Sequence, residues 1–262
     1  MSKISNIILL FILVDSVIMN AQDKDTLAKT SDILLYQSFG DYGAEFYKVD
    51  SRNSFLDNHI LFQPYVNNLN IFNIEFGIVN SYQEEGNFTT PGDLSLSYQR
   101  NFISKKYKST GFQGIAVRIK FTLPTGKLDY YSGHDTWALE PLIGTQWLLE
   151  NPDWFTSAQV RYYYSLSALP GKSPRFNFIW LEYFFGYENQ KVFFILSPDY
   201  RFIPNNSKHN LFLGIEIGYK VSSQIGIRSE FKPKVTGDEF YESLFLLGFY
   251  IYLNLNENDK KR

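Results

Sequence analysis

The sequence predicts an all-β fold: a closed antiparallel transmembrane β-barrel of about twelve strands. Three observations predict it. Apolar and polar side chains alternate along segments of roughly ten residues. The connections between these segments alternate between short and long. Aromatic residues make up 18% of the chain, and cysteine is absent. The first strand has the weakest alternation, so barrels of about ten or about fourteen strands remain open alternatives.

The clearest alternation lies in residues 115–123, where the odd positions are apolar and Arg118 and Lys120 occupy even positions. Residues 211–220 and 72–78 repeat this pattern, with glycine and both charge signs on the polar side. A soluble β-sandwich alternates as well, but glycine and mixed charges favour a crowded lumen over a solvated face. A Lys or Arg facing lipid costs about 2–4 kcal/mol at mid-bilayer. We therefore expect the apolar side to face lipid.

The connections support the same fold. We expect strands at residues 31–39, 58–66, 71–82, 92–102, 111–123, 136–148, 154–165, 175–187, 192–203, 211–220, 224–233 and 241–255. The even-numbered connections include tight polar turns at 67–70, 150–153, 188–191 and 221–223. The odd-numbered ones are mostly longer: 40–57, 83–91, 124–135, 166–174, 204–210 and 234–240. Short turns at one end and long loops at the other are typical of outer-membrane barrels.

Composition and the N-terminus limit the function classes. Lys and Arg number 25 against 27 Asp and Glu, so nucleic acid is not an expected partner. The absence of cysteine excludes disulfides, thiolate metal sites and a lipoprotein anchor. Residues 1–21 are expected to be a cleaved signal peptide, with Lys3 before an apolar run at 7–18 that is too short to span a bilayer. Residues 22–262 then form the barrel, with a short polar tail from Asn254.

Alternation also assigns the side chains that face the lumen. The acidic ones are Glu75, Asp93, Glu140, Glu182, Asp199, Glu216, Glu230 and Glu242. The basic ones are Arg118, Lys120, Arg161, Arg201, Lys220, Arg228 and Lys232. Either they form ion pairs that fill the lumen, or they form a charged constriction that selects solutes.

An apolar stretch interrupts the polar side of two neighbouring strands. The apolar side chains expected in the lumen are Trp180, Phe184, Phe193 and Ile195. They form either a pocket for a hydrophobic solute or a surface that packs against the N-terminal segment or an inserted loop.

Two stretches carry a family resemblance. Residues 92–99 read GDLSLSYQ, and the run 114–144 contains RIKFTLPTG at 118–126 and ALEPLIG at 138–144. They resemble the outer-membrane transporters of the phenol meta-cleavage (MetA) degradation pathway. The resemblance implies a barrel and the uptake of aromatic or other apolar solutes, and it carries over no catalytic residue. Without the family, Pro124 and Gly126 are explained as a strand terminator and a turn.

The sequence indicates a channel or transporter for small solutes, aromatic or apolar ones among them, and not an enzyme. No catalytic group, cofactor or metal site is predicted, and His59, His134 and His209 are expected at the outer strand ends or in loops. The expected partners are outer-membrane lipid, a small-molecule solute and the barrel-assembly machinery; the oligomeric state is left open. The alternatives are a plugged structural or adhesive barrel, a secreted soluble β-sandwich or lipid-binding protein, and a barrel hydrolase.

Overall fold

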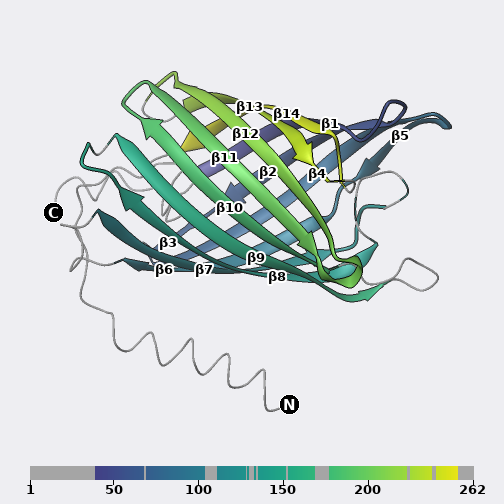
Figure 1. Cartoon of the computed structure of the whole chain (residues 1–262), viewed down its shortest axis with the longest axis horizontal. Helices are drawn as coiled ribbons and strands as arrows, with labels where there is room; N and C mark the ends of the chain where they lie inside the picture. Colours follow the sequence, from purple (N-terminus) through teal and green to yellow (C-terminus); the bar gives the residue numbers. More distant parts are fainter. Residues whose placement is uncertain are drawn as a thin grey trace, which may run out of the picture.

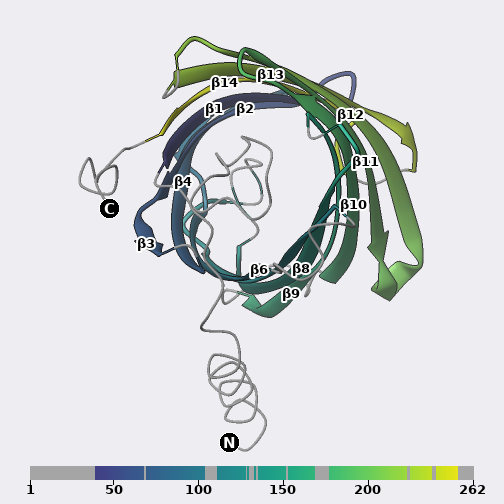
Figure 2. The same ribbon diagram turned by 90° about the vertical axis from the view of Figure 1, so that its left-hand side faces the viewer.

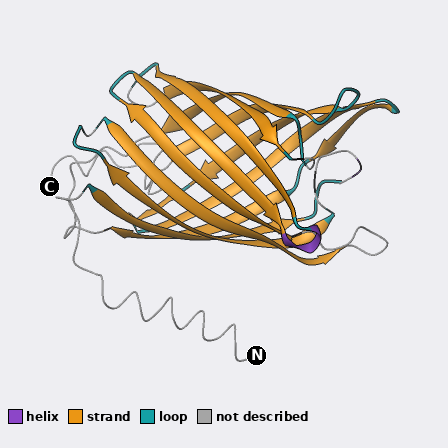
Figure 3. Ribbon diagram, in the orientation of Figure 1, coloured by secondary structure: helices purple, strands orange, loops and turns teal. Residues whose placement is uncertain are grey.

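The computed structural model describes residues 39–67, 69–103, 111–127, 129, 133, 135–151, 153–168, 177–222, 225–237 and 240–252. Nearly all of them are strand, with one short 3-10 turn at Pro204–Asn206 (Figure 3). No helix within these residues has the length and apolarity needed to cross a membrane. The expected signal peptide at 1–21 and the polar tail from 254 lie outside the described residues.

The chain forms a closed antiparallel barrel (Figures 1 and 2). Its strands are β1 (Phe39–Lys48), β2 (Ser54–Gln63), β3 (Tyr65–Asn67), β4 (Asn70–Gln83), β5 (Gly86–Pro91), β6 (Leu94–Ile103), β7 (Phe112–Leu123), β8 (Thr136–Leu148), β9 (Trp154–Ala168), β10 (Asn177–Glu188), β11 (Val192–Ile203), β12 (Lys208–Lys220), β13 (Ile225–Thr236) and β14 (Ser243–Tyr252). β1 pairs with β2 on one side and with β14 on the other, which closes the sheet.

Twelve of these strands make up the barrel wall. The other two, β3 and β5, pair only with β4 and prolong the lines of β2 and β6. Pro64 separates β2 from β3 because proline has no N–H to donate to a ladder. The predicted closed barrel of about twelve strands is thus confirmed.

The barrel has two distinct ends. We call the end where β1 begins and β14 finishes the termini end, because Phe39 and Tyr252 face each other there. The opposite end, which holds the turn at Pro204–Asn206, is the loop end. The hairpin of β4 and β5 projects from the loop end (Figure 1).

Two predicted loops were wrong. The expected loop 40–57 contains most of β1 and the start of β2, and the expected loop 83–91 contains β5. The strand expected at 31–39 falls, except for Phe39, outside the described residues. The missed strand β1 has a plain cause: Gly40, Gly43 and Ala44 leave it with too few large apolar side chains to show the alternation.

The outer surface of the barrel is apolar. In β14, Phe245, Leu247 and Phe249 are exposed, whereas Leu244 and Leu246 are buried on the inside. The same alternation runs through the other long strands. Because the whole wall exposes large hydrophobic side chains, water cannot be its solvent, and bilayer hydrocarbon must cover it.

The lipid-facing surface gives the first testable prediction. Ile119, near the middle of β7, is 39% exposed on this surface. We expect Ile119→Arg to lower the free energy of unfolding in lipid vesicles by about 2–4 kcal/mol, because the guanidinium must enter hydrocarbon. Thr236→Arg, at the loop end of β13, is the matched control and should cost about 0–1 kcal/mol. Equal losses for both variants would show that lipid does not surround β7.

Candidate functional site in the barrel lumen

Alternate side chains of nearly every strand point into the barrel, and many of them are charged. Lys120 on β7 lies 2.5 Å from Glu75 on β4, between Nζ and Oε2. Arg118 on the same strand reaches Glu140 on β8 at 3.8 Å. Both basic residues of β7 therefore form ion pairs with acids on other strands of the lumen wall.

Arg161 on β9 pairs with acids on both neighbouring strands. One of its guanidinium nitrogens lies 3.7 Å from Glu140, and another donates a hydrogen bond to Glu182 on β10. Gln159 donates to the same Glu182 carboxylate. Glu182 is buried, so its negative charge depends on these partners and not on water.

Asp199 on β11 is the most enclosed acid of these ion pairs, with 0% of its surface exposed. It accepts a hydrogen bond from Arg201 at 2.8 Å and lies 3.8 Å from the Lys232 ammonium. Lys232 in turn lies 3.2 Å from Glu230, so β11 and β13 are linked across the lumen side of β12.

Arg228 on β13 holds a separate group of ion pairs. Its guanidinium lies 3.5 Å from Glu216 on β12 and 2.5 Å from Asp41 on β1, which is 187 positions away along the chain. We call the ion pairs of Arg228 and of the three preceding paragraphs together the charged belt. Its members are Asp41, Glu75, Arg118, Lys120, Glu140, Arg161, Glu182, Asp199, Arg201, Glu216, Arg228, Glu230 and Lys232.

Three other expected lumen residues lie apart from the belt. Lys220 pairs with Glu188 at 2.7 Å near the termini end. Asp93 lies just before β6 and accepts a hydrogen bond from the Gly126 amide at 2.9 Å. Glu242 was expected in the lumen, but it is exposed and pairs with Lys48 at 3.4 Å at the loop end, because it lies in the connection before β14 and not in the strand.

The four apolar side chains expected in the lumen do not form one wall. Trp180 lies between two guanidinium groups, with the Arg161 carbon 3.7 Å and the Arg201 carbon 4.1 Å from its ring centre. Such contacts stabilise a cation over an aromatic face. Its indole Nε1 is buried without a hydrogen-bond partner. We call this arrangement the Arg–Trp stack.

Arg201 extends the Arg–Trp stack into an aromatic cluster at the loop end. Phe240 and Tyr241, from the connection between β13 and β14, lie 5.1 and 5.2 Å from its guanidinium carbon. The Tyr241 ring also lies 4.8 Å from the Phe212 ring. The side chains of Phe240 and Tyr241 therefore lie inside the lumen.

Phe184, Phe193 and Ile195 belong to a second cluster, at the termini end. They pack with Phe155 and Tyr250, and Phe193 is only 1% exposed. Glycines on neighbouring strands make room for the rings. A Cβ on Gly186 would lie 2.2 Å from Phe155, one on Gly218 would lie 1.9 Å from Phe193, and one on Gly226 would lie 2.1 Å from Tyr250. These three inward-facing glycines thus leave the space that the aromatic rings of the neighbouring strands occupy.

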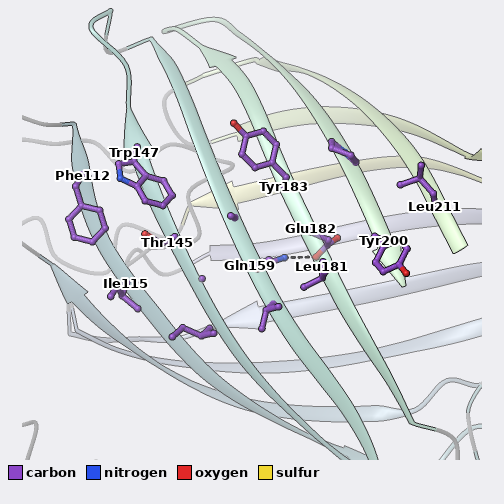
Figure 4. Close-up of a pocket in the computed structure, with 15 residues that line it drawn as sticks. Phe112, Ile115, Thr145, Trp147, Gln159, Leu181, Glu182, Tyr183, Tyr200 and Leu211 are labelled. Atoms are coloured by element: carbon purple, nitrogen blue, oxygen red, sulfur yellow. Dashed lines mark hydrogen bonds between the residues drawn. The ribbon is translucent and has the colours of Figure 1, made fainter. Parts of the chain in front are cut away.

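An apolar hollow of about 760 Å³ lies on the outer surface of the barrel wall. Trp147, Tyr183, Tyr200 and Leu211 border it, from strands between β7 and β12 (Figure 4). These side chains alternate with the lumen residues, so the hollow faces lipid.

Sequence reasoning missed several inward-facing groups. Asp41, Glu45 and Asp57 fall in the stretch expected to be a loop, so their alternation was not assessed. His59 was expected at an outer strand end, but it faces the lumen in the middle of β2 because this strand begins at Ser54. His209 lies near the loop end of β12, and His134 lies outside the described residues.

The closed wall, the apolar exterior and the charged interior define a transmembrane β-barrel of the outer-membrane class. No family model matches the sequence, and no curated protein is similar to it in sequence. Its fold is similar to the COG4313 outer membrane channel from Pseudomonas putida F1, with a TM-score of 0.65, 10% identity and coverage of 89% of this chain and 100% of that one. It is also similar to the NanC porin (TM-score 0.57, 12% identity, 82% and 100% covered) and the KdgM porin (TM-score 0.57, 9% identity, 82% and 99% covered).

Proposed function

We propose that this protein is an outer-membrane channel that admits small solutes, and small aromatic ones in particular, through the charged lumen. The Arg–Trp stack is the observation that carries the proposal. An aromatic solute can stack on the guanidinium plane of Arg161, which Trp180 holds from one side, and a carboxylate on the solute can pair with the same guanidinium. The resemblance to phenol-pathway transporters supports the same class of solute.

The similar structures support the channel part of the proposal. They are described as an outer membrane channel and as porins, and the KdgM porin was also solved with disordered oligogalacturonate. By the usual orientation of such barrels, the termini end faces the periplasm and the longer loops face outward. In this proposal the chain is exported after cleavage near residue 21 and is inserted by the barrel-assembly machinery.

The decisive experiment measures conductance of the purified barrel in planar bilayers, together with uptake of benzoate and acetate into vesicles. We expect the wild type to conduct and to favour benzoate. Trp180→Leu should reduce that preference roughly 2- to 10-fold, because Arg161 then loses the ring that orients its guanidinium, the equivalent of one lost cation–π contact. Trp147→Leu, which changes the lipid-facing surface, is the matched control and should keep it. A wild type that conducts but takes up benzoate and acetate equally well would refute the aromatic class of solute, while the protein would still be a channel.

The packing of the lumen favours one second candidate, a structural barrel closed by its own side chains. The loop-end cluster and the termini-end cluster both occupy the interior. A wild-type barrel that never conducts would support this second candidate against the channel.

A further inference from the structure

The wall formed by β1 and β2 holds a cluster that the charged belt does not use. Glu45 faces Asp57 directly across the two strands, and His59 lies two positions further along the same face of β2. One oxygen from each carboxylate and one imidazole nitrogen all lie within 4.8 Å of one another. These three side chains are partly buried and lie on the inward face of β1 and β2, between the middle of the strands and the loop end.

The spacing within the cluster fits ligands of one ion better than a hydrogen bond. His59 Nδ1 lies 3.8 Å from Glu45 Oε1, which is too long for a hydrogen bond. Two ligand atoms about 2.0–2.1 Å from a tetrahedral metal are about 3.4 Å apart, so a small side-chain rotation suffices. The Tyr47 hydroxyl donates to the other oxygen, Oε2, and holds the carboxylate in place.

Two glycines make space for the cluster. A Cβ on Gly43 would lie 2.4 Å from Cε1 of His59, and a Cβ on Gly77 would lie 2.7 Å from Oδ1 of Asp57. These glycines flank His59 on the two neighbouring strands. Any larger side chain at either position would displace a member of the cluster.

The two carboxylates of the cluster differ from the acids around it, because they have no Lys or Arg partner among the described residues. The neighbouring acids Asp41 and Glu75 are paired with Arg228 and Lys120, each at 2.5 Å. Among the described residues, no Lys or Arg forms an ion pair with Glu45 or Asp57. Oδ1 of Asp57 is buried and has no hydrogen-bond partner. A bound cation would supply the missing positive charge.

We propose that Glu45, Asp57 and His59 bind one divalent transition-metal ion, of the Zn²⁺ type, in the lumen wall. An imidazole nitrogen with two carboxylates suits Zn²⁺, whereas Ca²⁺ and Mg²⁺ prefer oxygen ligands alone. Three protein ligands leave a coordination position open toward the lumen. The site is independent of the proposed solute and of whether the barrel conducts.

The test uses the full chain without a histidine tag, folded in detergent micelles, with Zn²⁺ in calorimetry and Co²⁺ in absorption spectroscopy. We expect one equivalent of Zn²⁺ per chain. His59→Asn and Asp57→Asn should each weaken binding at least about tenfold, the lower bound for loss of a group that only supports a ligand. The visible bands of bound Co²⁺ should change in His59→Asn because the nitrogen ligand is lost.

Two control variants and one folding check make the result decisive. His209→Asn removes a histidine outside the cluster, and Glu188→Gln removes an inward-facing acid at the termini end, so both should bind like the wild type. Heat-modifiable migration in gels shows that each variant is folded, and Zn²⁺ should raise the unfolding temperature of the wild type but not of His59→Asn. Absence of wild-type binding, or binding that survives in both His59→Asn and Asp57→Asn, would overturn the proposal.

Discussion

Replacement of Asp199 by Asn is expected to destabilise the barrel by about 3–5 kcal/mol, the cost of removing one partner from a buried ion pair. Asp199 is fully buried, and both Arg201 and Lys232 direct positive charge at it. Asparagine fills nearly the same space but carries no charge. Two cations then remain in the lumen with one fewer counter-charge and little water to solvate them.

The measurement is the free energy of unfolding in urea, from tryptophan fluorescence of the barrel in lipid vesicles. Glu242→Gln is the matched control, because it breaks the Lys48–Glu242 pair, whose side chains are 52% and 48% exposed. An exposed pair contributes about 0–1 kcal/mol. If both variants lose the same small part of their free energy of unfolding, water fills the lumen around Asp199, and the charged belt does not stabilise the barrel.

The double variant Phe240→Ser and Tyr241→Ser is expected to raise single-channel conductance severalfold. Phe240 lies edge-on against Phe178 at 5.5 Å between ring centres, and Tyr241 against Tyr47 at 4.9 Å. These contacts place the rings of Phe240 and Tyr241 in the lumen at the loop end. Serine removes both rings from the path of a solute while leaving the connection at its natural length.

The Tyr241 contact is a hydrogen bond between a neutral phenol and a cation. Arg201 donates to the Tyr241 hydroxyl at 2.9 Å. Burial raises the pKa of Tyr241 above its usual value of 10.0, although the neighbouring Arg201 and Lys232 act in the opposite direction. The phenol therefore stays protonated at neutral pH, so the titration of Tyr241 itself adds no pH dependence to the conductance between about 6 and 8.

Val235→Ser is the control for this double variant, because Val235 is exposed near the loop end of β13 and faces away from the lumen. It should leave conductance unchanged. A conducting wild type whose conductance stays the same in the double variant would place the narrowest point elsewhere, with the cluster of Phe155, Phe193 and Tyr250 as the next position to test.

The sequence by itself determined the fold class and the inward or outward direction of most strand side chains. Period-two alternation is a local property, and charged groups such as Arg118 and Lys120 cannot face hydrocarbon, so β7 has only one favourable orientation. The same reasoning failed at β1, where glycine and alanine carry no such signal. For this reason the sequence did not predict that Glu45 and Asp57 face the lumen.

Only the tertiary structure decided which groups meet. Asp41 and Arg228 come together because β1 and β13 flank β14 in the closed wall, and the register between distant strands cannot be derived from alternation. The same holds for Trp180 between Arg161 and Arg201, for the inward fold of Phe240 and Tyr241, and for His59 beside two carboxylates. Alternation sets the face on which a side chain lies, whereas closure and register set its neighbours.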